Sequence, residues 1–129
     1  MIETQIRNLV VPTSSHIPEI GSRLYIGGLP DSVTWPAAVM YSISRVNEGY
    51  DTTIRTDRMQ FSVYADYLSS ADTIVEAIKT KVKRYHGQQS TLESYMVINT
   101  AFDNISYLYD SNVLKHVKIL DVLIRYMEV

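Results

Sequence analysis

The chain has 129 residues, of which 46% are hydrophobic and 20% charged, so we expect one folded, soluble domain over residues 1–129. The 14 acidic residues outnumber the 12 basic ones, and this balance excludes the cationic surface that specific nucleic-acid binding needs. There is no cysteine, which excludes disulfides, thiolate metal sites and cysteine nucleophiles and fits assembly in a reducing cytoplasm.

A short amphipathic helix is predicted first, with apolar residues at the spacing of one helix face: Ile2, Ile6, Leu9 and Val10. Pro12 prevents this helix from continuing far. Residues 22–26 favour a short strand that ends in a turn at the following glycine pair. In residues 37–46, Val39, Tyr41 and Ile43 alternate with serines, which predicts a strand with one buried face.

Residues 47–57 have little apolar content and several turn-forming residues, so they are predicted to form an exposed, mobile connection. Tyr50, Ile54 and Arg55 in this segment are candidate protein-interface residues; the alternative is a rigid surface loop without a role. A second strand, antiparallel to the first, is predicted over 58–66 because apolar residues recur at every second position: Met59, Phe61, Val63 and Ala65.

The period then changes to that of a long helix over 69–86, with an apolar stripe: Ala71, Ile74, Val75, Ile78, Val82 and Tyr85. Ser69 or Ser70 is the predicted N-cap, and Gly87 suits the left-handed closing position. The cationic end of this helix, Lys79 to Arg84, could contact phosphate or an acidic neighbour, but a solvated helix face is the favoured interpretation.

After a polar linker over 88–91, strands are predicted over 95–102 and 114–126, with a turn around Ser111 between them. In the last strand Asp121 and Arg125 share a face with apolar residues. They lie either at an exposed edge or between subunits, where paired charges fix the register, and they complete the candidate interface set. The predicted fold is α+β: a mostly antiparallel sheet packed against one long helix and a short N-terminal helix.

No catalytic, cofactor-binding or metal-binding residues are predicted. His16, His86 and His116 stand far apart without the spacing of a local metal motif. Ser15 and His16 are adjacent and cannot adopt the nucleophile–base geometry, and the glycine pair lacks the third glycine of a phosphate loop. The start of the chain lacks a signal-peptide pattern, and no apolar run approaches the length of a membrane span, so no membrane partner is expected.

Three stretches together resemble a known family. They are Ser-Arg-Leu-Tyr-Ile-Gly-Gly-Leu-Pro (22–30) followed by Trp-Pro-Ala-Ala-Val-Met-Tyr-Ser-Ile-Ser (35–44), Arg-Met-Gln-Phe-Ser-Val-Tyr-Ala-Asp (58–66), and Ile-Ser-Tyr-Leu-Tyr-Asp (105–110) with the closing strand. Their order resembles that of the tail terminator, or tail completion (tail-to-head joining), proteins of long-tailed phages and prophages.

The resemblance implies a virion protein at the head-proximal end of the tail, without catalytic residues or cofactor. It would cap the tail tube and join it to the head connector as one subunit of a homo-oligomeric, usually hexameric, ring through which DNA can pass, although the isolated chain can be monomeric. Ten tyrosines fit such interfaces, and they equally fit strands. Alternatives are a head-side connector or stopper subunit and a small ligand-binding regulatory α+β module.

Overall fold

The computed structural model describes residues 2–12, 17–47, 54–83, 90–92 and 95–128. These residues form two helices and six strands: α1 (Ile2–Val10), β1 (Leu24–Ile26), β2 (Ala37–Asn47), β3 (Ile54–Ala65), α2 (Leu68–Lys83), β4 (Ser90–Leu92), β5 (Tyr95–Asp110) and β6 (Lys115–Glu128). The strands make one sheet in the order β1-β2-β3-β6-β5-β4, with antiparallel pairing except between β1 and β2. The predicted α+β class is therefore confirmed.

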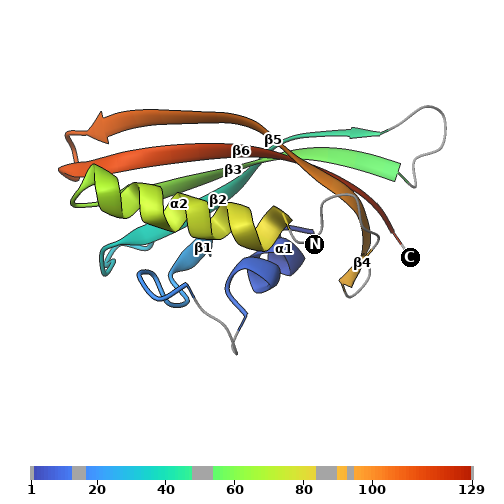
Figure 1. Cartoon of the computed structure of the whole chain (residues 1–129), viewed down its shortest axis with the longest axis horizontal. Coiled ribbons are helices and arrows are strands. Elements are labelled where there is room, and N and C mark those ends of the chain that lie inside the picture. Colours follow the sequence, from blue (N-terminus) through green and yellow to red (C-terminus); the bar gives the residue numbers. More distant parts are fainter. Residues whose placement is uncertain (1, 13–16, 48–53, 84–89, 93–94, 129) are drawn as a thin grey trace.

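Both helices lie on the same face of the sheet (Figure 1), which we call the helix face. Helix α2 runs along β3, β6 and β5, while α1 packs against β1, β2 and the side of α2. Side chains alternate between the faces of a strand, so each strand sends every second residue toward the helices. The opposite side of the sheet is called the second face.

The core fills the space between the helices and the helix face. The side chains of β3 that were predicted to share a buried face are all buried: Met59, Phe61, Val63 and Ala65. The described part of the predicted helical stripe faces them and is buried as well: Ala71, Ile74, Val75, Ile78 and Val82. These residues and apolar residues of α1 form one connected cluster. In it, the apolar faces of the helices, which repeat every 3.6 residues, pack against the buried face of the strands, which repeats every two residues.

Helix α2 begins one residue earlier than predicted, and the predicted serine N-cap is wrong. The Ala71 N–H donates to the carbonyl of Tyr67 at 3.1 Å, so Ser69 and Ser70 lie inside the first turn. The helix is attached to β6 by an ion pair of 2.6 Å between Lys118 and Asp72. The predicted closing residues after Lys83, like Tyr85, lie outside the described residues.

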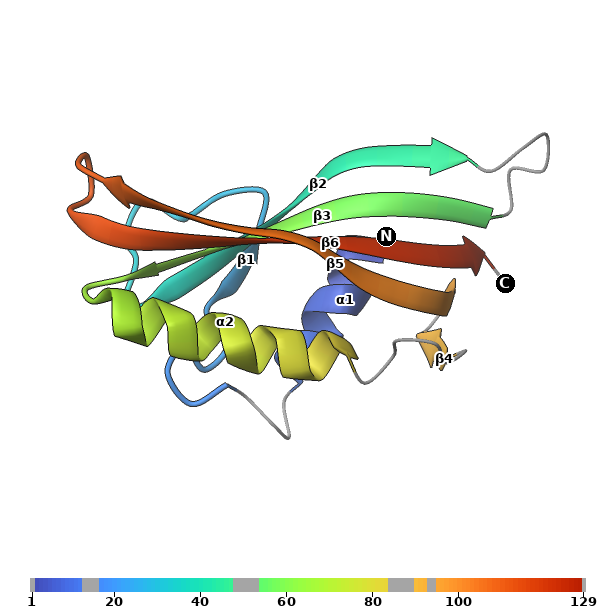
Figure 2. The same ribbon diagram turned by 45° about the horizontal axis from the view of Figure 1, so that its top comes forward.

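The prediction of one buried face along the whole of β2 is wrong. Its first four residues are buried on both faces, whereas every residue from Ser42 to Asn47 is exposed, with Ile43 at 51% and Val46 at 61%. The reason is tertiary. The hairpin of β2 and β3 extends beyond the helices that cover the rest of the sheet (Figure 2), so alternation in the sequence is not matched by a core there.

Three other boundaries also differ from the sequence prediction. The exposed connection over 47–57 is shorter than expected, because β3 already begins at Ile54 and Asp57 is fully buried. Strand β5 continues past Phe102 to Asp110, and a short strand, Ser90–Leu92, occupies part of the predicted polar linker. Cross-strand pairing to β6 stabilises the polar and tyrosine-rich end of β5, which local apolar content did not reveal.

We predict that Phe61→Ala lowers the free energy of unfolding by about 3–5 kcal/mol, because it leaves a cavity under α2. The matched control is Tyr67→Ala, which removes an aromatic side chain that is 71% exposed and should change the free energy by less than about 0.5 kcal/mol. Urea unfolding followed by circular dichroism measures both. Similar losses for the two variants would contradict the described core.

Candidate assembly surfaces

A buried carboxylate lies where the projecting hairpin leaves the body of the protein. Asp57 of β3 is fully buried and accepts hydrogen bonds from the Arg45 guanidinium, Nε to Oδ1 at 2.9 Å and Nη2 to Oδ2 at 2.8 Å. The Tyr126 hydroxyl donates to Oδ1 at 3.1 Å, and the Ser42 hydroxyl donates to Oδ2 at 3.4 Å. Arg45 also donates to Glu3 of α1 at 3.0 Å. We call these five residues the Asp57 cluster.

Burial and charge within the Asp57 cluster shift the pKa values of Arg45 and Tyr126. The hydrogen bonds and the charge of Asp57 raise the pKa of Arg45, so this guanidinium stays charged. Burial, aided by the nearby Asp57 charge, raises the pKa of Tyr126 to about 12. The acceptor oxygens of Asp57 are engaged by donors of the chain itself, so the Asp57 cluster fastens strands to a helix and offers no free base or nucleophile.

The structure places the candidate interface residues in different settings. Ile54 and Arg55 are half-buried at the start of β3, where they pair with Met127 and Tyr126 of β6. Because neighbouring residues of a strand point to opposite faces, Ile54 lies on the second face and Arg55 on the helix face. Tyr50, with the rest of the connection between β2 and β3, lies outside the described residues.

Asp121 and Arg125 lie on the second face of β6, as predicted from their spacing. Asp121 accepts a hydrogen bond from the Gln60 side chain at 3.2 Å and lies 3.9 Å from the Arg58 guanidinium. Arg58 also pairs with Asp103 of β5. The second face therefore carries a polar network across β3, β6 and β5, in which Asp121 is joined to residues that the sequence had not singled out.

Two groups of exposed apolar side chains lie near opposite edges of the sheet. Strand β5 exposes a run near its end, with exposed fractions between 39% and 49%: Ile105, Tyr107, Leu108 and Tyr109. On the other side, β2 exposes Ile43 and Val46. The tyrosines at 107 and 109 were the available sequence signal for the first group, but the predicted end of the strand at 102 concealed it.

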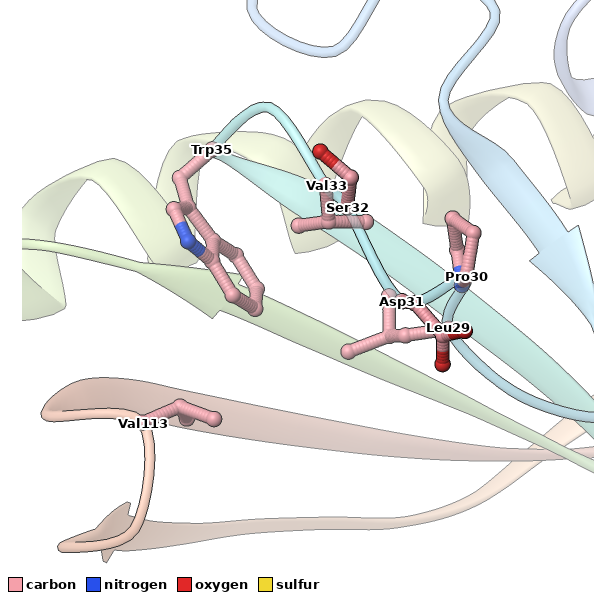
Figure 3. Close-up of a pocket in the computed structure, with 7 residues that line it drawn as sticks. All are labelled: Leu29, Pro30, Asp31, Ser32, Val33, Trp35 and Val113. Carbon is pink, nitrogen blue, oxygen red and sulfur yellow. The ribbon is translucent and has the colours of Figure 1, made fainter.

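A hollow of about 400 Å³ lies between the loop before β2 and the turn that joins β5 to β6 (Figure 3). Its lining is mixed: Leu29, Pro30, Asp31, Ser32, Val33, Trp35 and Val113. The polar side chains in it, Asp31 and Ser32, are exposed. The lining therefore supplies no buried polar group to orient a small ligand.

Histidines do not form a site in the part of the chain that is described. The Nδ1 of His116 lies 2.8 Å from the Tyr107 hydroxyl, and its ring packs on Tyr107 and Tyr109, whereas His16 and His86 fall outside the described ranges. A search of the described residues finds no group of His, Asp and Glu that could hold a metal ion. Neither described helix is long and apolar enough to cross a membrane.

The fold is shared with a chain of a gene transfer agent virion. No family model matches the chain, and no curated protein matches it. Among solved structures, a chain of the virion of the native gene transfer agent (GTA) particle superposes with a TM-score of 0.69 over 98% of this chain and 91% of that chain. The two sequences are 12% identical, so the comparison establishes a common fold over nearly the whole length.

We predict that Arg45→Met lowers the free energy of unfolding by about 2–3 kcal/mol, because it leaves the buried Asp57 carboxylate without its cation. The matched control is Arg58→Met. Its close partner Asp103 is exposed, so water can solvate that carboxylate, and Asp121 keeps its hydrogen bond from Gln60, so stability should change little. Chemical unfolding of both variants at neutral pH is the measurement. Equal effects would show that the Asp57 cluster does not support the fold.

We also predict that the free energy of unfolding decreases between pH 10 and about 12, in part because the pKa of Tyr126 is higher in the folded chain than in the unfolded chain. Below this window both states hold the phenol proton; within it the unfolded chain loses the proton and the folded chain keeps it, so the free energy of unfolding decreases as pH rises. Tyr126→Phe should cost about 1–2 kcal/mol at neutral pH, through the lost hydrogen bond to Asp57, and flatten the alkaline decline. An unchanged alkaline slope in the variant would contradict the assignment.

Proposed function

We propose that this chain is a structural subunit of a phage-like virion, where it caps the tail tube and joins the tail to the head connector as part of a hexameric ring. The observation that carries the proposal is the fold shared, over nearly the full length of both chains, with a component of the GTA virion. The order of the three sequence stretches adds the finer assignment to the tail terminator family.

The described surface supports an assembly role over a catalytic one. Its polar clusters are satisfied internally by ion pairs and hydrogen bonds between strands, as in the Asp57 cluster and the network around Asp121. Two groups of exposed apolar side chains, on β2 and near the end of β5, lie near opposite edges of the sheet; a ring subunit needs two such surfaces, because each copy must present two different surfaces to its neighbours. Ile54, Arg55 and Tyr50 would then contact a neighbouring copy, the tail tube protein or the connector.

Deletion of the gene in a producing strain tests this proposal. We expect heads filled with DNA and separate tails that fail to join, with joining restored when the protein is supplied in trans. If the protein is instead a head-side stopper, its deletion should give normal tails and heads that lose their DNA. Fully assembled, joined particles without the protein would contradict a role at this junction.

A thermal-shift experiment separates the assembly role from the ligand-binding alternative. We expect neither zinc nor ATP to raise the melting temperature, because a ligand that binds only the folded state must stabilise it by mass action. Trp35→Ala, which opens the hollow beside the turn at Val113, serves as the control for any shift that is seen. A reproducible shift that this variant abolishes would favour the regulatory module.

A further inference from the structure

The end of β5, residues 104–110, is an edge of the sheet that no strand covers within the described residues. Strand β4 pairs only with 95–97 of β5, so the later part of β5 has a strand neighbour only on the β6 side. Both irregularities in the pairing of β5 with β6 fall before residue 104, and the pairing is regular over 104–110. This stretch therefore presents a regular row of outward N–H and C=O groups to a further strand.

The 104–110 edge lacks the features that prevent strand pairing in monomeric proteins. Its sequence, Asn-Ile-Ser-Tyr-Leu-Tyr-Asp, contains no lysine or proline, the residues that commonly protect an edge. The outer edge of β2, by contrast, is interrupted by an irregularity between Ser42 and Ser44. Four apolar or aromatic side chains of 104–110 are 39–49% exposed: Ile105, Tyr107, Leu108 and Tyr109. A regular, apolar and unprotected edge is a template for another strand.

The aromatic side chains of this edge are already ordered by β6. Tyr107 and Tyr109 point to the helix face, because Lys118, the residue of β6 opposite Tyr107, reaches α2. The Tyr107 hydroxyl lies 2.8 Å from Nδ1 of His116. Both tyrosine rings contact this imidazole, with centroid distances of 5.8 and 5.0 Å. Side chains held in this way lose little freedom when a partner binds, so they suit an interface.

A second copy of the same edge fits this template in one register. Two copies related by a twofold axis perpendicular to the sheet run antiparallel at their β5 edges and keep their helices on the same side. Residues that lie opposite each other must then point to the same face, so the axis passes through a residue and not between two residues. Only an axis at Tyr107, the middle residue of 104–110, uses the whole regular stretch.

The register centred on Tyr107 brings compatible side chains together. Opposite residues in the two copies are Tyr107 and Tyr107, Ile105 and Tyr109, Ser106 and Leu108, and Asn104 and Asp110. The helix face thus gains aromatic and β-branched cross-strand pairs, which stabilise sheets, and no like charges lie opposite each other. About six to eight backbone hydrogen bonds join two such stretches. The edge is therefore complementary to itself in both side chains and backbone.

We infer that, before assembly, two copies of this protein pair antiparallel through 104–110 of β5, about a twofold axis at Tyr107, so that their sheets become one. A twofold contact is complete after two copies and cannot by itself build a ring, so the inference does not depend on the proposed function. The same apolar run is one of the two surfaces available to the proposed ring, so the dimer has to open before a ring closes. Until then it protects the edge from unrelated strands.

Charge exchange at the edge tests the inference. One variant carries Ser106→Lys with Leu108→Lys, and the other carries Ser106→Glu with Leu108→Glu. Because 106 of one copy lies opposite 108 of the other, each variant alone opposes like charges twice, whereas a mixture of the two opposes unlike charges. Both residues are exposed, and uncharged residues of β6 lie opposite them within the chain. The matched control, Ser44→Lys with Val46→Lys, makes the same change at two exposed positions of β2.

Sedimentation velocity of the purified full chain over a rising concentration series is the measurement. We expect a monomer–dimer equilibrium for the natural chain and for the control. The dissociation constant should rise about tenfold in each charged edge variant and return toward the natural value in their equimolar mixture. Restoration by mixing also shows that the variants fold, because only a folded copy can complete the edge of another. Monomers at every concentration, weakening by the control, or a mixture that stays monomeric would overturn the inference.

Hydrogen exchange at low and high protein concentration locates the contact. We expect slower exchange at high concentration for amides of 104–110 and no change along β2. Slowing on β2 in place of β5 would overturn the inference. A free chain that stays monomeric, but is still required for joining tails to heads, would overturn the inference and leave the proposed function standing.

Discussion

The fully buried carboxylate of Asp57 is the constraint on which the arrangement of the chain depends. A buried charge is tolerated only when it is paired and hydrogen-bonded, so Arg45, Tyr126 and Ser42 must converge on it from the two strands beside β3. Arg45 reaches on to Glu3 and thereby ties the N-terminal helix to the base of the projecting hairpin. One carboxylate thus sets the register of three strands and the position of α1, while α2 covers the apolar remainder of the sheet.

This arrangement leaves apolar side chains exposed on β2 and near the end of β5. The helices cover the middle of one sheet face, but the hairpin of β2 and β3 extends beyond them (Figure 2). Within the described residues, 41–47 of β2 and 98–110 of β5 have a strand neighbour on one side only. The ion pairs that hold the base of the hairpin matter for the proposed ring, because an interface gains little when its parts must first be ordered.

The sequence predicted those features that depend on local periodicity. The stripe of α2 and the alternation in β3 led to the correct core, because both patterns coincide with burial against each other. Alternation alone could not show that Ile43 would be exposed, since exposure depends on where the helices end, nor that β5 would continue through polar residues, since its partner supplies the stabilisation. Arg45 and Asp57 are separated in the sequence, and the residues next to them do not mark them as partners. Their contact depends on the tertiary structure.

Among the candidate interface residues, the spacing of Asp121 and Arg125 correctly predicted that they share a face. Nothing in the sequence indicated that Gln60 and Arg58 would be the partners of Asp121.

The central claim is that copies of this chain form a ring at the head-proximal end of a tail. Electron microscopy of assembled particles, with an antibody or tag marking this protein, measures its position and copy number together. We expect density of cyclic symmetry at the junction of tail and head, with several copies in each particle. Absence of the label from that end, or a single copy there, would contradict it.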